Sequence, residues 1–171
     1  GIKSQSRCTD NFINKSADIT VGHHFGIAPT ETKEAFESYV HSNNRTQIIQ
    51  KGTHNMVLDA YNANPTSMKA AIESLKTMEG ENKVLILGDM FELGKYELEE
   101  HQKIATLLQS ATFKKVYLIG ALFHKITTDA LQFKEFSDFK QHLKTQNLSN
   151  GNILIKGSRG MQLERAFDML K

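Results

Sequence analysis

The feature that most limits how this chain can fold is an alternation, from about residue 51 onward, of short β-rich runs with amphipathic helical patterns. Four runs predict strands: Met56–Leu58, Val84–Leu87, Val116–Ile119 and Ile153–Ile155. The second and fourth are apolar without alternation, which is typical of parallel strands covered by helices on both faces. A weaker candidate strand spans Phe133–Phe136, and Gln47–Gln50 can pair with Asn55–Asp59 as a hairpin.

Amphipathic helices are expected between these strands. Asn64 and Pro65 predict a helix start, because Asn is favoured at the N-cap and Pro at the first helical position. A shorter helix is expected over Ser137–Thr145, and Ser158 is expected to cap the last helix. The repeated β–α alternation predicts an α/β fold on an open, mostly parallel sheet with right-handed crossovers. Three stripes of mostly apolar residues carry the helical spacing: Met68, Ala71, Ile72 and Leu75; Leu98, His101, Ile104, Ala105 and Leu108; Leu163, Ala166, Phe167 and Leu170.

The first 50 residues follow a different pattern. Helices are expected over Asn11–His24 and Thr30–Tyr39, and the polar segment Ser42–Arg45 is typical of a linker. We therefore predict two domains, residues 1–42 and residues 43–171. The first piece is too short to bury a core of its own, so we expect it to belong to a larger domain.

Composition and missing motifs remove several functional classes. The net charge of +2 gives no electrostatic basis for binding nucleic acid or an acidic membrane. No apolar run approaches the roughly 18 residues of a membrane span, and Cys8 alone cannot form an internal disulfide. We therefore expect a cytoplasmic protein. The patterns HExxH, CxxC, GxSxG, GxGxxG and the P-loop are all absent, so the expected fold has no phosphate-binding cradle of its own.

Polar and glycine-containing segments follow the predicted strands. Asp59–Pro65 follows the first strand, Gly88–Met90 the second, Gly120 the third and Lys156–Gly160 the last. Ligands of open α/β sheets bind beyond the carboxyl ends of the strands. These segments are therefore expected to line one edge of the sheet and to face one ligand.

Residue chemistry suggests roles at this edge, each with a structural alternative. Asp59 suits the hydroxyls of a ribose, or it caps the next turn. Asn62 and Asn64 suit a small polar ligand, or they serve as turn and N-cap residues. The segment Lys156–Arg159 at a helix N-terminus would attract a carboxylate or phosphate, or it is a solvated loop. His101 lies among apolar neighbours and is expected to be a hydrogen-bonded packing residue.

These motifs together resemble the Mur ligase family, whose members use ATP to build peptidoglycan precursors. The resemblance runs through Asn43–Gln47, Asp59–Met68, Leu87–Gly94 and Lys156–Met161, in the family's order and spacing across residues 43–171. The loop Tyr61–Pro65 favours the branch that adds D-alanyl-D-alanine over other Mur or folylpolyglutamate-type ligases.

The resemblance implies a Rossmann-like C-terminal domain over residues 43–171, preceded by the end of a central ATP-binding domain over residues 1–42. In the family reaction, ATP phosphorylates the terminal carboxylate of UDP-N-acetylmuramoyl-tripeptide. The amine of D-alanyl-D-alanine then attacks that acyl phosphate, and Mg²⁺ offsets the phosphate charge. Catalytic residues and metal ligands are expected only in the N-terminal and central domains, so the isolated chain should be an inactive monomer.

For ATP, the resemblance assigns four residues of this chain. Arg45 corresponds to an arginine that reaches the phosphates from the linker, which a permanently charged, bidentate guanidinium suits. Asp59 corresponds to the acid that holds the ribose. Asn11 and Asn14 match a motif on the adenine side, where Asp10 replaces a common histidine.

For the incoming dipeptide, the resemblance points to the loops after the first and last strands. Asn62, Ser158 and Arg159 fall where the family recognises it, and Asn64 is a further candidate for substrate binding. Closure about a hinge near Asn43–Gln47 would bring these groups to the ATP site.

Two other functions stay open at this point. The chain could be a stand-alone α/β module for a small anionic ligand or nucleotide, although it has no obvious phosphate site. It could also be a protein-interaction domain without ligand chemistry. Polar strand-end residues gathered in one place would count against the latter.

Overall fold

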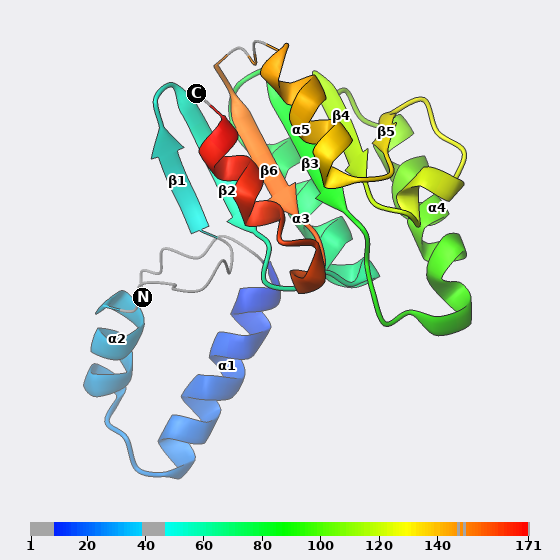
Figure 1. The fold of residues 1–171 in the computed structure, drawn as a ribbon. Coiled ribbons are helices and arrows are strands. Elements are labelled where there is room, and N and C mark those ends of the chain that lie inside the picture. The colour runs from blue at the N-terminus through cyan, green and yellow to red at the C-terminus, as the bar shows by residue number, and fades with distance from the viewer. Residues whose placement is uncertain (1–8, 39–46, 147, 149, 171) are drawn as a thin grey trace. The chain divides into compact units, whose positions relative to one another are not determined.

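The computed structural model describes residues 9–38, 47–146, 148 and 150–170, and side chains only from residue 16 onward. The chain divides into two compact units, Gly1–Ser42 and Asn43–Lys171 (Figure 1).

The first unit is a helical hairpin made of α1 (Thr9–His24) and α2 (Pro29–Ser38). Both helices agree with the sequence prediction to within two residues. Gly26 turns the chain between them with a φ of 76°, a conformation that glycine adopts without strain. Among residues 16–38 only Gly22 is buried, so the described part of this unit has no hydrophobic core.

The second unit contains a six-stranded sheet in the order β1-β2-β6-β3-β4-β5. β1 and β2 pair antiparallel as the expected hairpin, and the other four pairings are parallel. The prediction of an open, mostly parallel sheet is therefore confirmed. The strands are β1 (Gln47–Lys51), β2 (His54–Asp59), β3 (Lys83–Gly88), β4 (Lys115–Ile119), β5 (Leu131–Phe133) and β6 (Asn152–Lys156).

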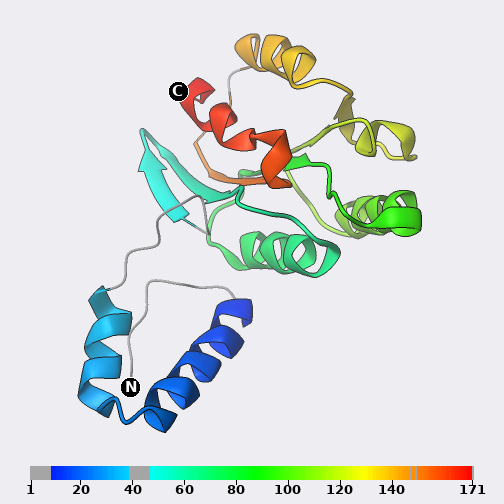
Figure 2. The ribbon, with the colours of Figure 1, turned by 60° about the horizontal axis from the view of Figure 1, so that its bottom comes forward.

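Helices cover both faces of this sheet (Figures 1 and 2). α3 (Pro65–Thr77) and α4 (Glu97–Gln109) pack on one face, and α5 (Phe136–Lys144) and the 3₁₀ helix η4 (Leu163–Met169) pack on the other. The steps β2 to β3 and β3 to β4 run in one direction across the sheet, whereas the step from β5 to β6 runs back. Because crossovers between parallel strands are right-handed, α3 and α4 lie on one face of the sheet and α5 lies on the opposite face.

The start of α3 forms as the sequence predicts. The Asn64 side chain accepts a hydrogen bond from the Ser67 amide at 2.8 Å, and the Ser67 hydroxyl accepts one from the Asn64 amide. Pro65 occupies the first helical turn. The predicted stripe of α3 is buried, which anchors the helix on the sheet: Met68, Ala71, Ile72 and Leu75.

Two predicted elements differ from the structure. The weak strand expected at Phe133–Phe136 is observed as β5 at Leu131–Phe133. It ends earlier than predicted because Glu135 is the N-cap of α5 and Phe136 already belongs to that helix. The helix expected after Ser158 is instead two 3₁₀ helices, η3 (Arg159–Met161) and η4.

Ser158 occupies the N-cap position of η3, as expected, but its side chain makes no capping hydrogen bond. Gln162 adopts a left-handed conformation with a φ of 50°, which interrupts any continuous helix. The predicted apolar residues Leu163, Ala166 and Leu170 are nevertheless buried. The spacing thus identified the buried face but not the type of helix.

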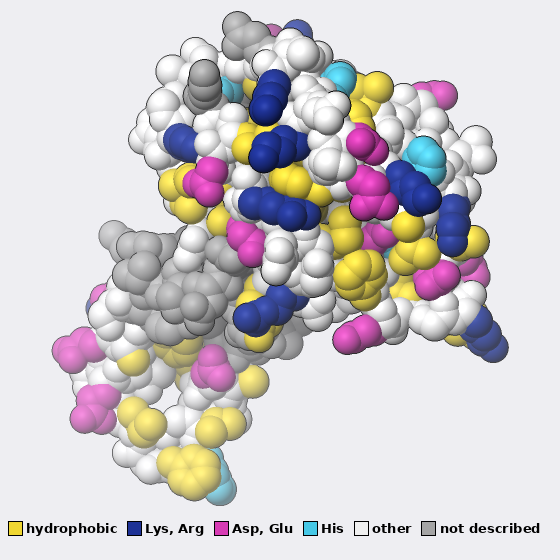
Figure 3. Space-filling view, in the orientation of Figure 1, with side chains coloured by type: hydrophobic (Ala, Val, Ile, Leu, Met, Phe, Trp, Pro, Cys, Tyr) yellow, Lys and Arg dark blue, Asp and Glu magenta, His cyan; other side chains and the backbone are white. Residues whose placement is uncertain are grey.

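Cations flank aromatic rings on the outer face over η4 and α5. Figure 3 shows Lys and Arg side chains among hydrophobic ones on this side of the unit. The Lys51 Nζ atom lies 4.7 Å from the Phe167 ring centroid, and the Arg165 Cζ atom lies 3.8 Å from the Phe136 ring centroid. These contacts cover apolar surface while the charges stay near solvent.

Candidate functional site

The loops that follow the parallel strands share one edge of the sheet, which we call the rim: Asp59–Asn64, Gly88–Phe91, Ile119–Phe123 and Lys156–Arg159. In the strand register, Asp59 pairs with Lys156, Leu87 with Lys156, and Gly88 with Ile119. Two backbone hydrogen bonds continue this pairing past the strand ends, from the Ser158 amide to the Asp89 carbonyl at 3.0 Å and from the Asp89 amide to the Ile119 carbonyl at 3.1 Å. The predicted gathering of the strand-end segments is therefore observed.

Asp59 and Lys156 form an ion pair at the rim. The Lys156 ammonium donates to Asp59 Oδ2 at 2.6 Å and to the Asn62 carbonyl at 3.0 Å. The Lys156 side chain is 1% exposed and that of Asp59 is 18% exposed. Lys156 was expected in a segment open to an anion, but its ammonium is buried against the loop that follows β2.

Ser158 connects three loops with a buried hydroxyl. Its Oγ accepts a hydrogen bond from the Phe91 amide at 2.8 Å and lies 3.5 Å from the Ala63 carbonyl, to which it donates. The residue is 3% exposed. The loops after β2, β3 and β6 are thus held at one point.

The exposed polar groups at the rim come from two loops. Arg159 is exposed, and its guanidinium carbon lies 5.2 Å from the Tyr61 ring centroid. Asn62 is also exposed, and its side-chain oxygen accepts from the Ala63 amide at 2.8 Å. Asn64 serves as the N-cap of α3, the alternative that the sequence left open. Sequence reasoning did not single out Tyr61, although its place beside Asn62 offered a signal.

Asp89 and His101 hold the middle of the rim. The Asp89 carboxylate is 2% exposed and accepts from the amides of Leu122 and Phe123, each at 2.9 Å. His101 is fully buried, and its Nε2 accepts from the Met90 amide at 2.9 Å while its Nδ1 faces the Glu97 carbonyl. This pattern requires the neutral Nδ1–H tautomer. The prediction that His101 is a hydrogen-bonded packing residue is confirmed.

Gly120 is needed for the contact around Asp89. Its φ is 129°, and an added Cβ would lie 2.3 Å from the Asp89 carboxylate. Any side chain at this position would displace the carboxylate that fixes the loop after β4.

Three predicted site residues fall where the structure describes no side chain. Arg45 lies outside the described residues, and Asn11 and Asn14 lie in α1 without described side chains. Within the described part of the chain, no group of three His, Cys, Asp or Glu residues could hold a metal ion. Among the same residues, no helix is long and apolar enough to cross a membrane.

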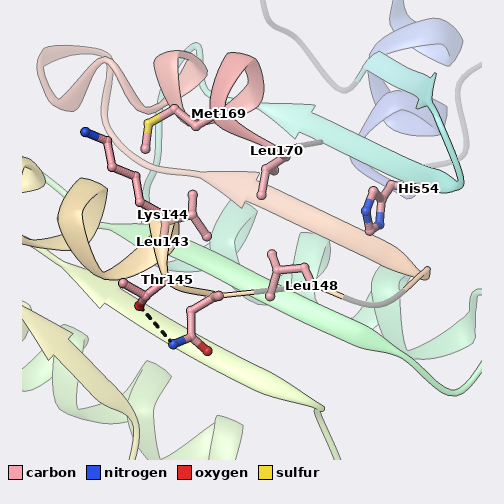
Figure 4. A pocket seen from close by; sticks show the side chains of 8 residues that line it. His54, Leu143, Lys144, Thr145, Leu148, Met169 and Leu170 are labelled. Atoms are coloured by element: carbon pink, nitrogen blue, oxygen red, sulfur yellow. Dashed lines mark hydrogen bonds between the residues drawn. The ribbon is translucent and has the colours of Figure 1, made fainter.

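A cavity of about 380 Å³ lies away from the rim, near the amino end of β2 (Figure 4). His54, at the start of β2, lines it with residues from the ends of α5 and η4, including Leu143, Thr145 and Leu170. Ligands of parallel sheets bind at the carboxyl ends of the strands, so this cavity lies on the wrong side for the predicted site.

A family profile described as "Mur ligase, glutamate ligase domain" matches residues 44–159. A UDP-N-acetylmuramoyl-tripeptide–D-alanyl-D-alanine ligase from Bacillus subtilis is 36% identical over 90% of this chain. The ligase of the same name from Rickettsia prowazekii is 37% identical over 72% of this chain. The matches span only 36% and 29% of the lengths of those relatives.

Solved structures share the fold. A crystal structure of MurF from Acinetobacter baumannii covers 99% of this chain with a TM-score of 0.84 and 24% identity. The MurF ligase of Thermotoga maritima in complex with ADP covers 95% with a TM-score of 0.79 and 23% identity. This chain covers 39% and 38% of those structures.

Proposed function

This chain belongs to the Mur ligase family, and we propose that it supplies the C-terminal domain of a ligase that joins D-alanyl-D-alanine to UDP-N-acetylmuramoyl-tripeptide. One observation supports this most directly. The loops after β2, β3 and β6 meet at one rim, with the Asp59 carboxylate and the Arg159 guanidinium on neighbouring loops. The relatives that match over most of the chain bear that activity in their names.

The proposal assigns residues 1–42 to the end of a central ATP-binding domain and residues 43–171 to the C-terminal domain. The exposed apolar side chains of the helical hairpin support this assignment, since Val21 is 55% and Phe25 is 77% exposed. Such residues fit a surface that the rest of a larger domain covers. The reaction would take place in the cytoplasm, with the ligase as a monomer.

Asp59 is proposed to bind ATP, accepting hydrogen bonds from the ribose hydroxyls at the exposed part of its side chain. Arg45 is proposed to bind the phosphates, and Asn11 and Asn14 the adenine side. Magnesium would offset the phosphate charge but would be held by other parts of the ligase. Since this sequence has no P-loop, the isolated chain should not turn over ATP.

Arg159 and Asn62 are proposed to bind D-alanyl-D-alanine. A guanidinium binds a carboxylate through two parallel hydrogen bonds, and stacking on Tyr61 restricts its orientation. The Asn62 amide group can donate to a peptide carbonyl. Ser158 and Asn64 would shape this subsite by holding its loops, because Ser158 is buried and Asn64 caps α3. The dipeptide amine would then point toward the tripeptide carboxylate held by the other domains.

The test uses a hybrid ligase, in which this chain replaces the matched C-terminal part of the Bacillus subtilis relative. Phosphate release should require ATP, UDP-N-acetylmuramoyl-tripeptide and D-alanyl-D-alanine together, and the isolated chain should release none. Arg159→Ala should raise the KM for the dipeptide by about tenfold or more. Arg165→Ala is the matched control, because Arg165 stacks on Phe136 on the outer face.

Three outcomes would overturn the proposal: a hybrid that is inactive, one that uses a single amino acid in place of the dipeptide, or one in which Arg159→Ala and Arg165→Ala have equal effects. Use of glutamate would instead point to the folylpolyglutamate type, whose synthase from Thermotoga maritima shares the fold with a TM-score of 0.60.

A further inference from the structure

Lys156 is the most completely buried cation in the described part of the second unit. It is 1% exposed at the end of β6, a strand whose five residues are all buried. Removing an ammonium from water is strongly unfavourable unless an opposite charge and hydrogen-bond acceptors compensate. Its position therefore depends on the groups that meet its Nζ atom.

Both of those groups lie at the carboxyl end of β2, because Asp59 is the last residue of that strand and Asn62 lies in the loop that follows it. Nζ lies 2.6 Å from Asp59 Oδ2 and 3.0 Å from the Asn62 carbonyl. Asp59 and Lys156 are direct partners in the parallel register, so their side chains leave the sheet on the same face. That face is the one covered by α3, since Leu154, two residues before Lys156, packs in the same core as Met68 and Ile72.

We infer that Lys156 is a positioning residue, which fixes the Asp59 carboxylate and the Asn62 backbone for the substrates. This inference rests on the proposed function of the rim. With 1% exposure Lys156 has no surface to offer a ligand, so it acts through the two groups it holds. The ion pair sets the direction of the Asp59 carboxylate, and the second bond ties the loop that carries Asn62 to the same point.

Ser158 holds the loop after β3 as well as the loop after β2, which separates the two residues experimentally. Its hydroxyl meets the Phe91 amide and the Ala63 carbonyl rather than Asp59. Substitution of Lys156 should therefore weaken nucleotide binding first, because Lys156 acts through Asp59. Loss of Ser158 should also change the arrangement of the loop after β3, to which the Lys156 side chain makes no hydrogen bond among the described residues.

The first experiment uses this chain as it stands. The side-chain ammonium of Lys156 should give a slowly exchanging proton–nitrogen NMR signal that disappears in Asp59→Asn. In Lys156→Met, which keeps most of the apolar stem, backbone amide signals of residues 59–64 should shift or broaden while those of α4 stay in place. An absent ammonium signal, or an unchanged loop in Lys156→Met, would overturn the inference without involving ligase activity.

The second experiment is a double-mutant cycle in the hybrid ligase. Lys156→Met should raise the KM for ATP by about tenfold and change kcat by less than about threefold, and Lys156→Arg should restore part of the loss. In an Asp59→Asn background, Lys156→Met should add less than about twofold. A purely structural role would produce equal effects in both backgrounds.

Lys51→Met is the matched control for this cycle. The Lys51 ammonium also donates to a backbone carbonyl, that of Phe167 at 2.8 Å, but Lys51 pairs with His54 at the end of the sheet away from the rim. Its loss should leave both KM values unchanged. If the unaltered hybrid is inactive, the proposed function fails, while the NMR experiment still decides whether Lys156 positions the loop. If the hybrid is active and Lys156→Met has no effect, only the positioning role fails.

Discussion

The helical hairpin and the sheet unit differ in how much of their described side-chain surface is buried. Both contain helices that their sequences predict, yet among residues 16–38 only Gly22 is buried. In the sheet unit, α3, α4, α5, η4 and the central strands contribute to cores on the two faces of the sheet. Local helix signals are therefore present in both regions, but among the described residues only the sheet unit shows the buried packing that stabilises a fold.

The largest expected difference between the two regions is in the cost of removing a buried side chain. Leu85, in the middle of β3, is fully buried. Leu85→Ala should lower the free energy of unfolding by about 2–5 kcal/mol, because lost burial and a new cavity both destabilise the fold. Chemical denaturation followed by far-ultraviolet circular dichroism measures this, since the chain has no Trp. A loss below about 1 kcal/mol would show that the sheet core is loosely packed.

A second contrast compares two carboxylates that bind backbone amides. Asp89 accepts from Leu122 and Phe123 inside the sheet unit, whereas Glu31 accepts from the exposed Ala28 amide at 3.1 Å. Asp89→Asn should lower the free energy of unfolding by about 2 kcal/mol, because it replaces a charged acceptor in a buried place. Glu31→Gln should cost less than about 0.5 kcal/mol. Similar losses of unfolding free energy in both variants would show that the buried and the exposed hydrogen bonds contribute equally.

A substitution in the sheet core should have the opposite sign. The Tyr117 hydroxyl is buried and has no hydrogen-bond partner among the described residues. Tyr117→Phe should raise the free energy of unfolding by about 1 kcal/mol near neutral pH.

The pH dependence of stability in the same variant provides a second test of the burial of Tyr117. Burial raises the pKa of Tyr117 above its ordinary value of 10.0. Above that pH the unfolded chain loses the proton while the folded chain keeps it, so stability falls as the pH rises. Tyr117→Phe should lack this part of the alkaline loss. An equal decline in both proteins above pH 10.0 would contradict the burial of this hydroxyl.

The smallest effect is expected in the hairpin. Phe25 is 77% exposed, so Phe25→Ser should change the free energy of unfolding of this chain by less than about 0.5 kcal/mol. Its solubility should rise because an exposed apolar ring is lost. A larger destabilisation would indicate that the hairpin has a core of its own.

Sequence patterns predicted the parts of the fold that depend on local spacing. The four main strands, the β1–β2 hairpin, the Asn64 N-cap of α3 and the gathering of loops at the rim all follow from such patterns. The packing role of His101 followed from its apolar neighbours. The prediction of one continuous helix after Ser158 is wrong, because Gln162 adopts a left-handed conformation that breaks the helix. The Ser158 hydroxyl accepts a hydrogen bond from the loop after β3 instead of capping the helix.

The contacts at the rim that sequence could not predict are long-range. Asp59 and Lys156 are 97 residues apart, and Ser158 meets Ala63 across 95 residues. No local pattern distinguishes a lysine at a strand end that faces an anion from one that is buried against a carboxylate. That difference appears only when β2 and β6 become neighbours in the sheet.

The central claim is that ligands bind at the rim, and amide hydrogen exchange tests it most directly. The hybrid ligase would be compared with and without D-alanyl-D-alanine and a non-hydrolysable ATP analogue. Exchange should slow in the loops 59–64 and 157–160 and stay unchanged around His54 and Thr145, which line the cavity away from the rim. Protection at that cavity, with no change in the two loops, would contradict the assignment.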